Sequence, residues 1–402
     1  MLSDTSAETV RATLPIVSGA IDKISACFYD RLFAAHPELL RDLFNRGNQA
    51  NGAQQQALAG AIAGFASALV APSQARPAAM LDRIAHKHAS LGIAPDQYRI
   101  VHTHLFAAIA EVLGDAVTDE VAAAWDEVYW LLANTLISME RRLYAEADAP
   151  AGDVWRDYRV VGRTQEADDV VSFLVRPLDG TPPPLFRPGQ YVSVQVELPD
   201  GARQIRQYSL SSARSEALHF TVKAIVDPTG ATPNGEVSTH LHTHLHAGHV
   251  LRISVPFGDV TLDEGDDRPV LLISAGIGCT PMIAMLDQLV ATGSPRRVVA
   301  LHGDRTQRTH ALSTELGELV RKLPDATAHV WYEQPAPPWP AHRTGRVELS
   351  AVPLPDPRHS VAYLCGPLPF LCTTHNQLRA LGMPTDDIHY EVFGPDLWRG
   401  EG

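Results

Sequence analysis

Cysteine and positive charge are both scarce in this sequence. Four cysteines, Cys27, Cys279, Cys365 and Cys372, lie far apart in a chain of 402 residues, so a disulfide framework is not expected and a reducing compartment is favoured. The 33 Lys and Arg residues are outnumbered by 46 Asp and Glu, which leaves a net charge of -13. Such a charge repels nucleic-acid phosphates and anionic lipid. We therefore expect no nucleic-acid partner and no obligatory membrane partner.

The sequence also lacks a secretory signal and a long hydrophobic run. Its start has no basic region followed by an apolar stretch, so we expect a cytoplasmic protein. The most apolar segment, Ala57 to Ala71, is shorter than the roughly 20 residues that span a bilayer, and it predicts a buried helix. Hydrophobic residues make up 45% and charged residues 20% of the chain, values typical of a folded globular protein.

Residues 1–147 carry apolar side chains at intervals of three and four, the period of amphipathic helices. Four such helices each align one polar residue with the apolar stripe, and these residues are His88, Gln54, Tyr98 and Glu140. A buried imidazole or carboxylate is costly unless it is paired. The pattern alone leaves two alternatives open, a histidine satisfied by hydrogen bonds in the core and a histidine that binds a metal.

Several short motifs in this helical segment carry a resemblance to a known family. They are Phe28-Tyr29-Asp30-Arg31, His36-Pro37-Glu38-Leu39, Phe44 and Lys87-His88. In this order and spacing they resemble the globin domain of the flavohaemoglobin family. The resemblance implies that His88 is the proximal ligand of a haem iron.

The resemblance also implies roles on the two faces of the haem. Tyr98 and Glu140 would orient His88, because a carboxylate bonded to the ring nitrogen that faces away from the iron makes the imidazole a stronger donor. Tyr29 and Gln54 would lie on the other face, where a phenol and an amide stabilise the partial negative charge of bound dioxygen. The remaining implied contacts are Leu58 in the pocket, Phe44 on the porphyrin, and Lys87 either at a propionate or in solvent.

After a short linker at 149–152 the hydrophobic period changes to two, which predicts strands. Strands are expected at 160–161, 170–175, 191–196, 220–226 and 250–255. Their short, turn-punctuated spacing predicts a small antiparallel barrel over residues 153–264. This segment contains Pro188-Gly189-Gln190-Tyr191, Arg206-Gln207-Tyr208-Ser209 and Gly235-Glu236-Val237-Ser238. Together they resemble the flavin domain of the ferredoxin reductase superfamily.

The residue types in these motifs suit FAD. Arg206 offers a bidentate fork for the pyrophosphate, Tyr208 a flat surface for the isoalloxazine ring, and Ser209 a hydroxyl for its reactive nitrogen. Gly235 and Ser238 are expected to open a helix whose free backbone amides hold the same phosphates. The neighbouring motif residues complete the expected FAD site: Tyr191, Gln207 and Val237.

Residues 268–402 alternate strand and helix, which predicts a doubly wound α/β domain. Strands are expected at 270–274, 298–302, 330–332 and 361–365. A turn with Gly276 and Gly278 leads into Thr280-Pro281, and proline suits the first turn of a helix. Together with Cys365-Gly366-Pro367, this turn resembles the nicotinamide lobe of the same superfamily. The resemblance places Thr280 and the cysteine-glycine-proline turn near the nicotinamide.

The run from His389 to Pro395 also matches the family. By this resemblance Phe393 covers the flavin until the nicotinamide displaces it, and Glu391 lies between the flavin and the haem. The choice between NADH and NADPH stays open: Asp304 suits a ribose hydroxyl, whereas Arg305 suits a 2′-phosphate, and we favour NADH.

The resemblance covers the chain from end to end, so the sequence is identified as a member of the flavohaemoglobin family. We expect an all-α globin domain (1–147), an antiparallel β-barrel flavin domain (153–264) and a doubly wound α/β nicotinamide domain (268–402). The implied cofactors are haem b with its iron, FAD, and NADH or NADPH.

The reaction implied by the resemblance is nitric oxide dioxygenation. NAD(P)H reduces FAD, FAD reduces the haem iron, and the oxy-ferrous haem converts NO and O2 to nitrate. The alternatives are a haem-flavin NAD(P)H oxidase, a peroxide reductase or a denitrosylase, and, from a different class, a sensor that binds O2 or NO. We expect a monomer, and a lipid in the haem pocket is left open.

Overall fold

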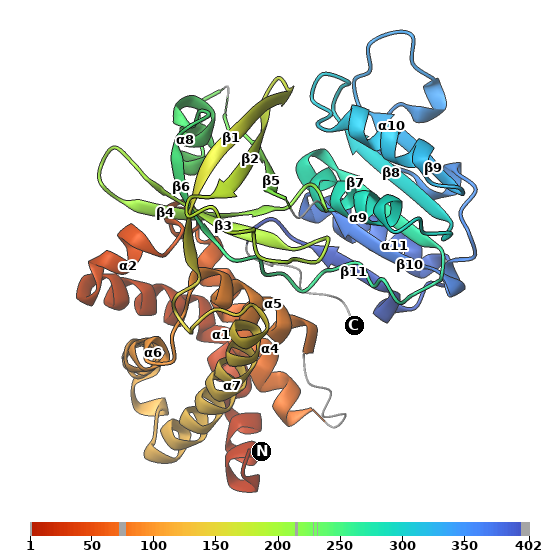
Figure 1. Cartoon of the computed structure of the whole chain (residues 1–402). Coiled ribbons are helices and arrows are strands. Elements are labelled where there is room, and N and C mark those ends of the chain that lie inside the picture. The colour runs from red at the N-terminus through yellow and green to blue at the C-terminus, as the bar shows by residue number, and fades with distance from the viewer. Residues whose placement is uncertain (1, 72–77, 214–215, 228, 231, 395–402) are drawn as a thin grey trace. The chain divides into compact units, whose positions relative to one another are not determined.

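The structure is a computed structural model that describes residues 2–394 except 72–77, 214–215, 228 and 231 (Figure 1). By packing, the chain divides into two compact units. The first, which we call the helical unit, contains Met1–Trp155 and also Glu197–Ile205. The second, the reductase unit, contains Arg156–Val196 and Arg206–Gly394. The three domain boundaries expected from the sequence stay a prediction.

The helical unit consists of helices joined by short turns. They are α1 (Asp4–Ala35), α2 (Pro37–Asp42), α3 (Arg46–Ala50), α4 (Ala53–Val70), α5 (Ala78–Leu91), α6 (Gln97–Leu113), η1 (Gly114–Ala116) and α7 (Asp119–Glu146). Side-chain caps begin several of them: the side chains of Ser3, Asn45 and Thr118 accept backbone N–H groups of the first turns of α1, α3 and α7. The helix α1 packs against α4, α6 and α7, and α5 packs against α7. These contacts confirm the expected all-α segment.

The apolar segment Ala57 to Ala71 falls on α4 and on the residue that follows it. Ala59, Phe65 and Ala66 on this helix are buried. Within the part of the chain that the structure describes, no helix combines the length and the hydropathy that crossing a membrane requires.

The flavin segment is a six-stranded sheet with the strand order β4-β3-β6-β1-β2-β5. Its strands are β1 (Trp155–Ala167), β2 (Val170–Pro177), β3 (Tyr191–Glu197), β4 (Arg203–Ser209), β5 (Leu218–Lys223) and β6 (Val250–Ser254). An antiparallel bridge between Leu210 and Phe220 joins the end of β4 to β5, so the two outer strands of the sheet meet. This closure fits the expected antiparallel barrel. The helix α8 (Glu236–His244) follows β5.

Three details of this sheet differ from the sequence prediction. The strand expected at 160–161 is much longer, from Trp155 to Ala167. The strand β4 was not predicted, because its sequence, Arg203 to Ser209, is mostly polar and lacks the apolar alternation of its neighbours. The strand expected at 220–226 ends earlier, at Lys223, and begins earlier, at Leu218.

The nicotinamide segment is a five-stranded sheet with the order β11-β10-β7-β8-β9, and the pairs in it are parallel. Its elements are β7 (Val270–Ala275), η2 (Gly276–Gly278), α9 (Cys279–Ala291), β8 (Val298–Asp304), α10 (Ser313–Lys322), β9 (Ala326–Tyr332), η3 (Ala341–Arg343), η4 (Leu349–Ala351), η5 (Pro357–His359), β10 (Val361–Cys365), α11 (Leu368–Ala380), η6 (Thr385–Asp387) and β11 (Ile388–Glu391). The prediction missed β11, which is short and half polar.

The strand order of this sheet reverses between β7 and β10. Right-handed crossovers therefore place α9 and α10 on one face and α11 on the other, which confirms the doubly wound topology. The core lies between the sheet and α9, where Leu272, Ala300, Ile283 and Leu286 are buried. Ligands of such sheets bind outside the carboxyl ends of the strands at the point of reversal. That point carries Gly276–Gly278 after β7 and Gly366 after β10.

Candidate functional site

Three helices bring His88, Tyr98 and Glu140 together in the helical unit. His88 Nδ1 on α5 lies 2.9 Å from Glu140 Oε1 on α7 and 2.9 Å from the Tyr98 hydroxyl on α6. The Tyr98 hydroxyl donates to the same Glu140 oxygen at 2.5 Å, and Glu140 is only 2% exposed. Because a carboxylate only accepts hydrogen bonds, we assign the imidazole proton to Nδ1. The lone pair of His88 Nε2 is then available to a metal, as a haem requires.

Further hydrogen bonds hold Tyr98 and the segment that follows α5. Burial, and then the charge of Glu140, raise the pKa of Tyr98 well above its usual range, so its phenol stays protonated and donates. The Tyr129 hydroxyl donates to the Tyr98 carbonyl at 2.6 Å, and the Tyr144 hydroxyl donates to the Ile93 carbonyl at 2.7 Å. Both supporting tyrosines lie on α7 and were not singled out in the sequence, because their helical spacing matches an ordinary core stripe.

A second cluster forms around Tyr29 on α1. Tyr29 is 4% exposed, and its ring lies 5.6 Å from that of Phe33 and 5.8 Å from that of Phe44. Burial raises the pKa of Tyr29 to about 12, although hydrogen bonds with Gln54 and then Gln49 lower it in part. The structure thus brings Tyr29 and Gln54 together. It also adds Gln49, which the sequence prediction missed because α3 is too short to show a period.

Leu58 and Lys87 lie next to these clusters in the chain. Leu58 follows Gln54 by one turn of α4, and Lys87 precedes His88 on α5. Both side chains are half-buried. Their expected contacts with the pocket and with a propionate stay predictions.

The flavin motif Arg206 to Ser209 occupies the end of β4. The Tyr208 ring stacks on Phe220 of β5, with centroids 5.8 Å apart and planes inclined by 29°. Gln207 Nε2 donates to Ser193 Oγ at 2.8 Å, and Ser209 is 4% exposed. The expected neighbour Tyr191 lies on β3 and pairs through its backbone with Phe257. Arg206 and Tyr208 lie two residues apart on one strand, as a phosphate fork and a ring surface for FAD on the same face would require.

A glycine-led turn opens α8, as the sequence predicts. Ser238 Oγ accepts the Ile225 N–H and donates to the Gly235 carbonyl, each at 3.2 Å. A Cβ on Gly235 would lie 2.6 Å from Ser238 Oγ and 2.9 Å from Ile225 Cβ, so the turn requires glycine. Val237 is 1% exposed and belongs to the core, so it can meet a phosphate only through its backbone. The amides that begin α8 have no side-chain cap and suit an anion.

The glycine turn after β7 meets the turn after β10. Gly276 has a φ of +54°, and a Cβ there would point into open space. A Cβ on Gly278 would lie 2.3 Å from the Cys365 carbonyl oxygen, so this close approach requires glycine. Thr280 Oγ1 donates to the Ile277 carbonyl at 3.0 Å, and Thr280 is 2% exposed. The two turns expected near the nicotinamide are thus in contact, with Pro281 in the first turn of α9 and Pro367 just before α11.

The two cysteines near this turn are not expected to be reactive. Burial raises the pKa of the Cys279 thiol to about 12 and raises the pKa of the Cys365 thiol well above its usual range. Both thiols are therefore protonated at neutral pH, and a thiol is a poor nucleophile.

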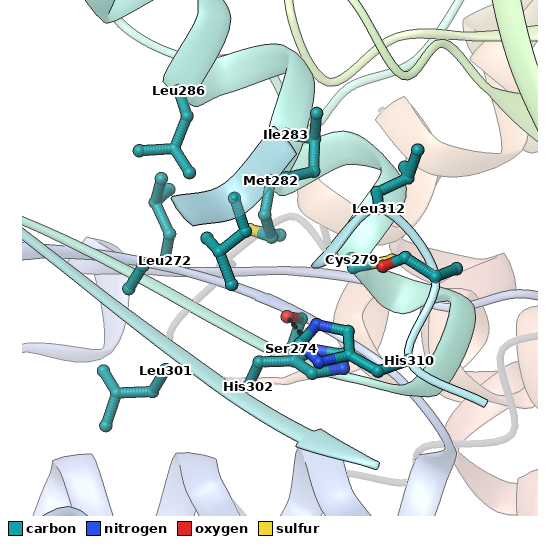
Figure 2. A pocket seen from close by; sticks show the side chains of 13 residues that line it. Leu272, Ser274, Cys279, Met282, Ile283, Leu286, Leu301, His302, His310 and Leu312 are labelled. Atoms are coloured by element: carbon teal, nitrogen blue, oxygen red, sulfur yellow. Dashed lines mark hydrogen bonds between the residues drawn. The ribbon is translucent and has the colours of Figure 1, made fainter. Parts of the chain in front are cut away.

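A polar cluster that the sequence did not reveal lies beside the pocket drawn in Figure 2, between α9 and the ends of β7 and β8. Ser274 Oγ lies 2.9 Å from His302 Nδ1, and the ring of His302 stacks on that of His310 at 4.1 Å. His310 Nδ1 lies 2.8 Å from the Tyr332 hydroxyl. Burial, and then His302, lower the pKa of His310 to about 3, so this imidazole is neutral. The cluster links the ends of the neighbouring strands β7, β8 and β9.

Asp304 belongs to this cluster and points inward. Its carboxylate accepts the Arg305 N–H at 2.6 Å and the Thr309 hydroxyl at 2.5 Å, and it lies 3.6 Å from His302 Nε2. Burial favours a raised pKa, but His302, Thr309 and the Arg305 N–H outweigh it and lower the pKa of Asp304 to about 2. The carboxylate therefore organises its own loop. The Arg305 side chain is 65% exposed and lies 3.7 Å from Asp169.

The last motif lies at the end of the described residues. Glu391 is 8% exposed on β11, in register with Cys365 on β10. Phe393 follows β11 and is 45% exposed. Pro395 lies outside the described residues. The expected positions of Glu391 and Phe393 against the flavin stay predictions.

Comparisons with known proteins agree with this architecture. The family models Globin and Oxidoreductase NAD-binding domain match residues 26–136 and 272–376. The flavohemoprotein of Rhizobium meliloti is 41% identical over 99% of this chain and 100% of its own length. That of Bordetella parapertussis is 42% identical over 98% of this chain and 99% of its own length. The chain belongs to the flavohemoprotein family.

Solved structures of this flavohemoprotein's relatives match it as well. A flavohemoglobin from Malassezia yamatoensis, solved with bound FAD and heme, is 36% identical and has a TM-score of 0.88 over 98% of this chain and 100% of that one. The Flavohem-like-FAD/NAD Binding Domain of Nitric Oxide Dioxygenase from Vibrio cholerae is 34% identical, with a TM-score of 0.55 over 60% of this chain and 99% of that one. These matches confirm the fold class, and the chain is an NAD(P)H-dependent oxidoreductase.

Proposed function

We propose that this flavohemoprotein is a nitric oxide dioxygenase that detoxifies NO with haem, FAD and NAD(P)H. The reaction balances as two NO, two O2 and one NAD(P)H giving two nitrate ions, NAD(P)+ and one proton. The observation that carries the proposal is the cluster of His88, Tyr98 and Glu140, in a helical unit that also holds Tyr29 with Gln54. The likeness of the reductase segment to a domain of a protein named nitric oxide dioxygenase supports it.

The three residues on α5, α6 and α7 suit a haem that activates O2. Glu140 accepts a hydrogen bond from His88 Nδ1, which would leave Nε2 to bind a haem iron and would make the ring a stronger electron donor. A strong proximal donor favours reaction of bound oxygen over its storage. This argues against a simple oxygen carrier or sensor.

Tyr29 and Gln54 suit the face of the haem opposite His88, where the ligand would bind. The pKa of Tyr29, raised by burial to about 12, keeps its hydroxyl protonated at neutral pH, so it can donate a hydrogen bond. Donors fixed in a buried pocket stabilise negative charge that develops on a ligand without having to reorganise. Tyr29 would therefore polarise O2 for attack by NO.

The reductase unit carries the residues for the electron supply. When bound, FAD accepts a hydride and releases single electrons, which a haem can take up. Arg206 and the amides of α8 would hold the FAD pyrophosphate, with Tyr208 against the ring. The turn at Gly276 and Gly278 would hold the pyrophosphate of NAD(P)H.

The test compares NADH oxidation in air with and without NO, and measures nitrate. We expect NO to accelerate NADH oxidation and to yield two nitrate ions per NADH. Tyr29→Phe should lower the NO-dependent rate by about 10- to 100-fold, because it removes one donor to the bound ligand. Tyr158→Phe is the matched control: Tyr158 is equally buried, but it lies on β1 and its hydroxyl has no hydrogen-bond partner among the described residues. Nitrous oxide as the main product, or no acceleration by NO, would contradict the proposal and favour an oxidase or a sensor.

A further inference from the structure

A short piece of the reductase half of the sequence folds with the helices. Residues Glu197–Ile205, at the turn between β3 and β4, pack as part of the helical unit. The contacts are made with the corner where α2 ends and α3 begins. The Globin match ends at residue 136, so these residues lie outside the sequence that it covers.

Gln204 makes the central contact, and it is fully buried. Its Nε2 donates to the carbonyl oxygens of Leu40, Arg41 and Phe44 at 3.3, 3.0 and 3.2 Å. Its Oε1 accepts the Arg46 N–H at 3.3 Å. The carbonyls at the end of a helix and the amides at the start of the next have no partners within those helices. One side-chain amide thus caps both sides of the corner.

Two ion pairs flank this amide. Arg203 reaches Asp42 with its N–H at 3.1 Å and with Nη2 at 3.0 Å, and Arg46 Nη1 lies 2.6 Å from Asp200 Oδ2. Hydrogen bonds from Arg41 and then Arg203 hold the pKa of Asp42 below its usual range, so Asp42 is charged at neutral pH. Exposed pairs such as these add little stability alone, but here they fix the register of a buried hydrogen-bonded group.

The corner held in this way carries one wall of the candidate haem pocket. The ring of Phe44 meets Tyr29 edge-on at 5.8 Å and Phe33 edge-on at 5.4 Å. Phe44 is also one of the residues whose carbonyl Gln204 binds. A shift of the corner therefore moves Phe44 and, through ring packing, the phenol of Tyr29.

We propose that Gln204 is a positioning residue for the haem pocket, so that residues Glu197–Ile205, which pack within the helical unit, complete that pocket. The inference rests on the proposed function only in taking Tyr29 and Phe44 as pocket walls. It predicts that Phe44 and Tyr29 shift from their positions when the amide of Gln204 is removed, even though the Gln204 side chain does not contact either ring.

The test uses the full-length protein with haem and FAD. Gln204→Leu keeps the side-chain size and removes all of its hydrogen bonds. The control is Gln195→Leu on the neighbouring strand β3, where Gln195 Oε1 accepts from the side chain of Arg252 on β6 at 3.5 Å. Hydrogen exchange and the C–O stretching frequency of the carbon monoxide adduct are measured in both variants. The first reports the opening of residues 37–50, and the second reports hydrogen-bond donors beside the bound ligand.

In Gln204→Leu we expect exchange of the amides in residues 37–50 to accelerate about tenfold. We also expect the C–O stretch to shift as Tyr29 moves, whereas Gln195→Leu matches the parent protein in both measurements. A lowered melting temperature with an unchanged C–O stretch would mean a merely structural role and would overturn the proposal. The proposal would also be overturned if the amides of residues 37–50 in Gln204→Leu exchanged at the rate of the parent protein.

Gln204→Asn keeps the amide but shortens the side chain, and it covers the case in which the leucine variant does not fold. We expect a C–O shift in the same direction, and a parent-like frequency in this variant would overturn the proposal. Neither measurement uses NO or NADH. Failure of this inference is therefore distinguishable from failure of the proposed dioxygenase activity.

Discussion

At the scale of single residues, the chemistry depends on a few polar side chains that are buried and paired. Glu140 is 2% exposed and accepts from both Tyr98 and His88. A buried carboxylate without partners would be strongly destabilising, so its presence in a helical core indicates a use. The same reasoning applies to Gln204, which is fully buried and forms hydrogen bonds through both of its amide atoms.

Glu140→Gln tests the role of this carboxylate. The substitution keeps the size of the side chain but removes the charge that strengthens the imidazole. We expect the haem to stay bound, the iron–histidine stretching frequency to fall in resonance Raman spectra, and turnover to slow by about tenfold. The control is Glu146→Gln at the end of the same helix, where Glu146 is exposed and lies 3.6 Å from Arg142. An equal iron–histidine frequency in parent and Glu140→Gln would show that the carboxylate does not tune His88.

At the scale of elements, the candidate nucleotide site of the reductase unit depends on a close contact between two turns, one after β7 and one after β10. The parallel strands β7 and β10 are neighbours, and their carboxyl ends lead into turns that touch at Gly278 and Cys365. Such contact leaves no room for a side chain. Glycine is therefore required by packing at Gly278, whereas at Gly276 it is required by a positive φ.

Gly278→Ala tests this close approach. The added Cβ would lie 2.3 Å from the Cys365 carbonyl, and backbone on both sides would have to move. We expect reduction of FAD by NADH to slow by at least about tenfold, with a loss of stability of about 1 to 3 kcal/mol. Stopped-flow flavin absorbance and thermal unfolding measure the two effects.

The matched control for this substitution is Gly317→Ala on α10. A Cβ at Gly317 meets nothing within 4 Å, so the change should stabilise the helix slightly. Equal rates of flavin reduction in Gly278→Ala and Gly317→Ala would show that the contact between the turns does not shape the nucleotide site.

At the scale of the whole molecule, the chain joins a globin domain to an NAD-binding oxidoreductase domain. The strand β4 belongs to both units, because Gln204 packs with the helices and Arg206 lies in the reductase unit. A substitution in the flavin motif should therefore separate the two halves functionally without removing either fold.

Arg206→Ala is the corresponding prediction. Loss of a charge-assisted hydrogen bond to a phosphate costs about 1.5 to 3 kcal/mol, so FAD occupancy should fall by roughly 10- to 100-fold at limiting FAD. The haem absorption band should stay intact, while reduction of the haem by NADH should stop and recover when excess FAD is added. Arg252→Ala on β6, outside the flavin motif, is the control. Full flavin content and normal haem reduction in Arg206→Ala would remove Arg206 from the FAD site.

The sequence by itself determined the fold class and the order of the segments. The reason is that these depend on local features, each of which can be recognised within a few residues. They are the helical and strand periods, the glycine turns and the proline at the start of α9. Local features also placed His88 and Gln54 on helices, and Gly276 and Gly278 in a turn. They missed β4 and β11, which are polar or short and become strands only by pairing with neighbours.

No local pattern decides which of these residues meet. The family resemblance predicted that Tyr98 and Glu140 orient His88, and the tertiary structure brings the three together. His88, Tyr98 and Glu140 come from three helices, and the approach of Glu140 to His88 spans 52 residues of sequence. Nearby residues do not predict that Asp304 points inward or that Gln204 contacts the α2–α3 corner. Each contact depends on how distant segments pack. Periodicity fixes which face of an element is buried, but the partner on the other side is chosen by how the elements pack.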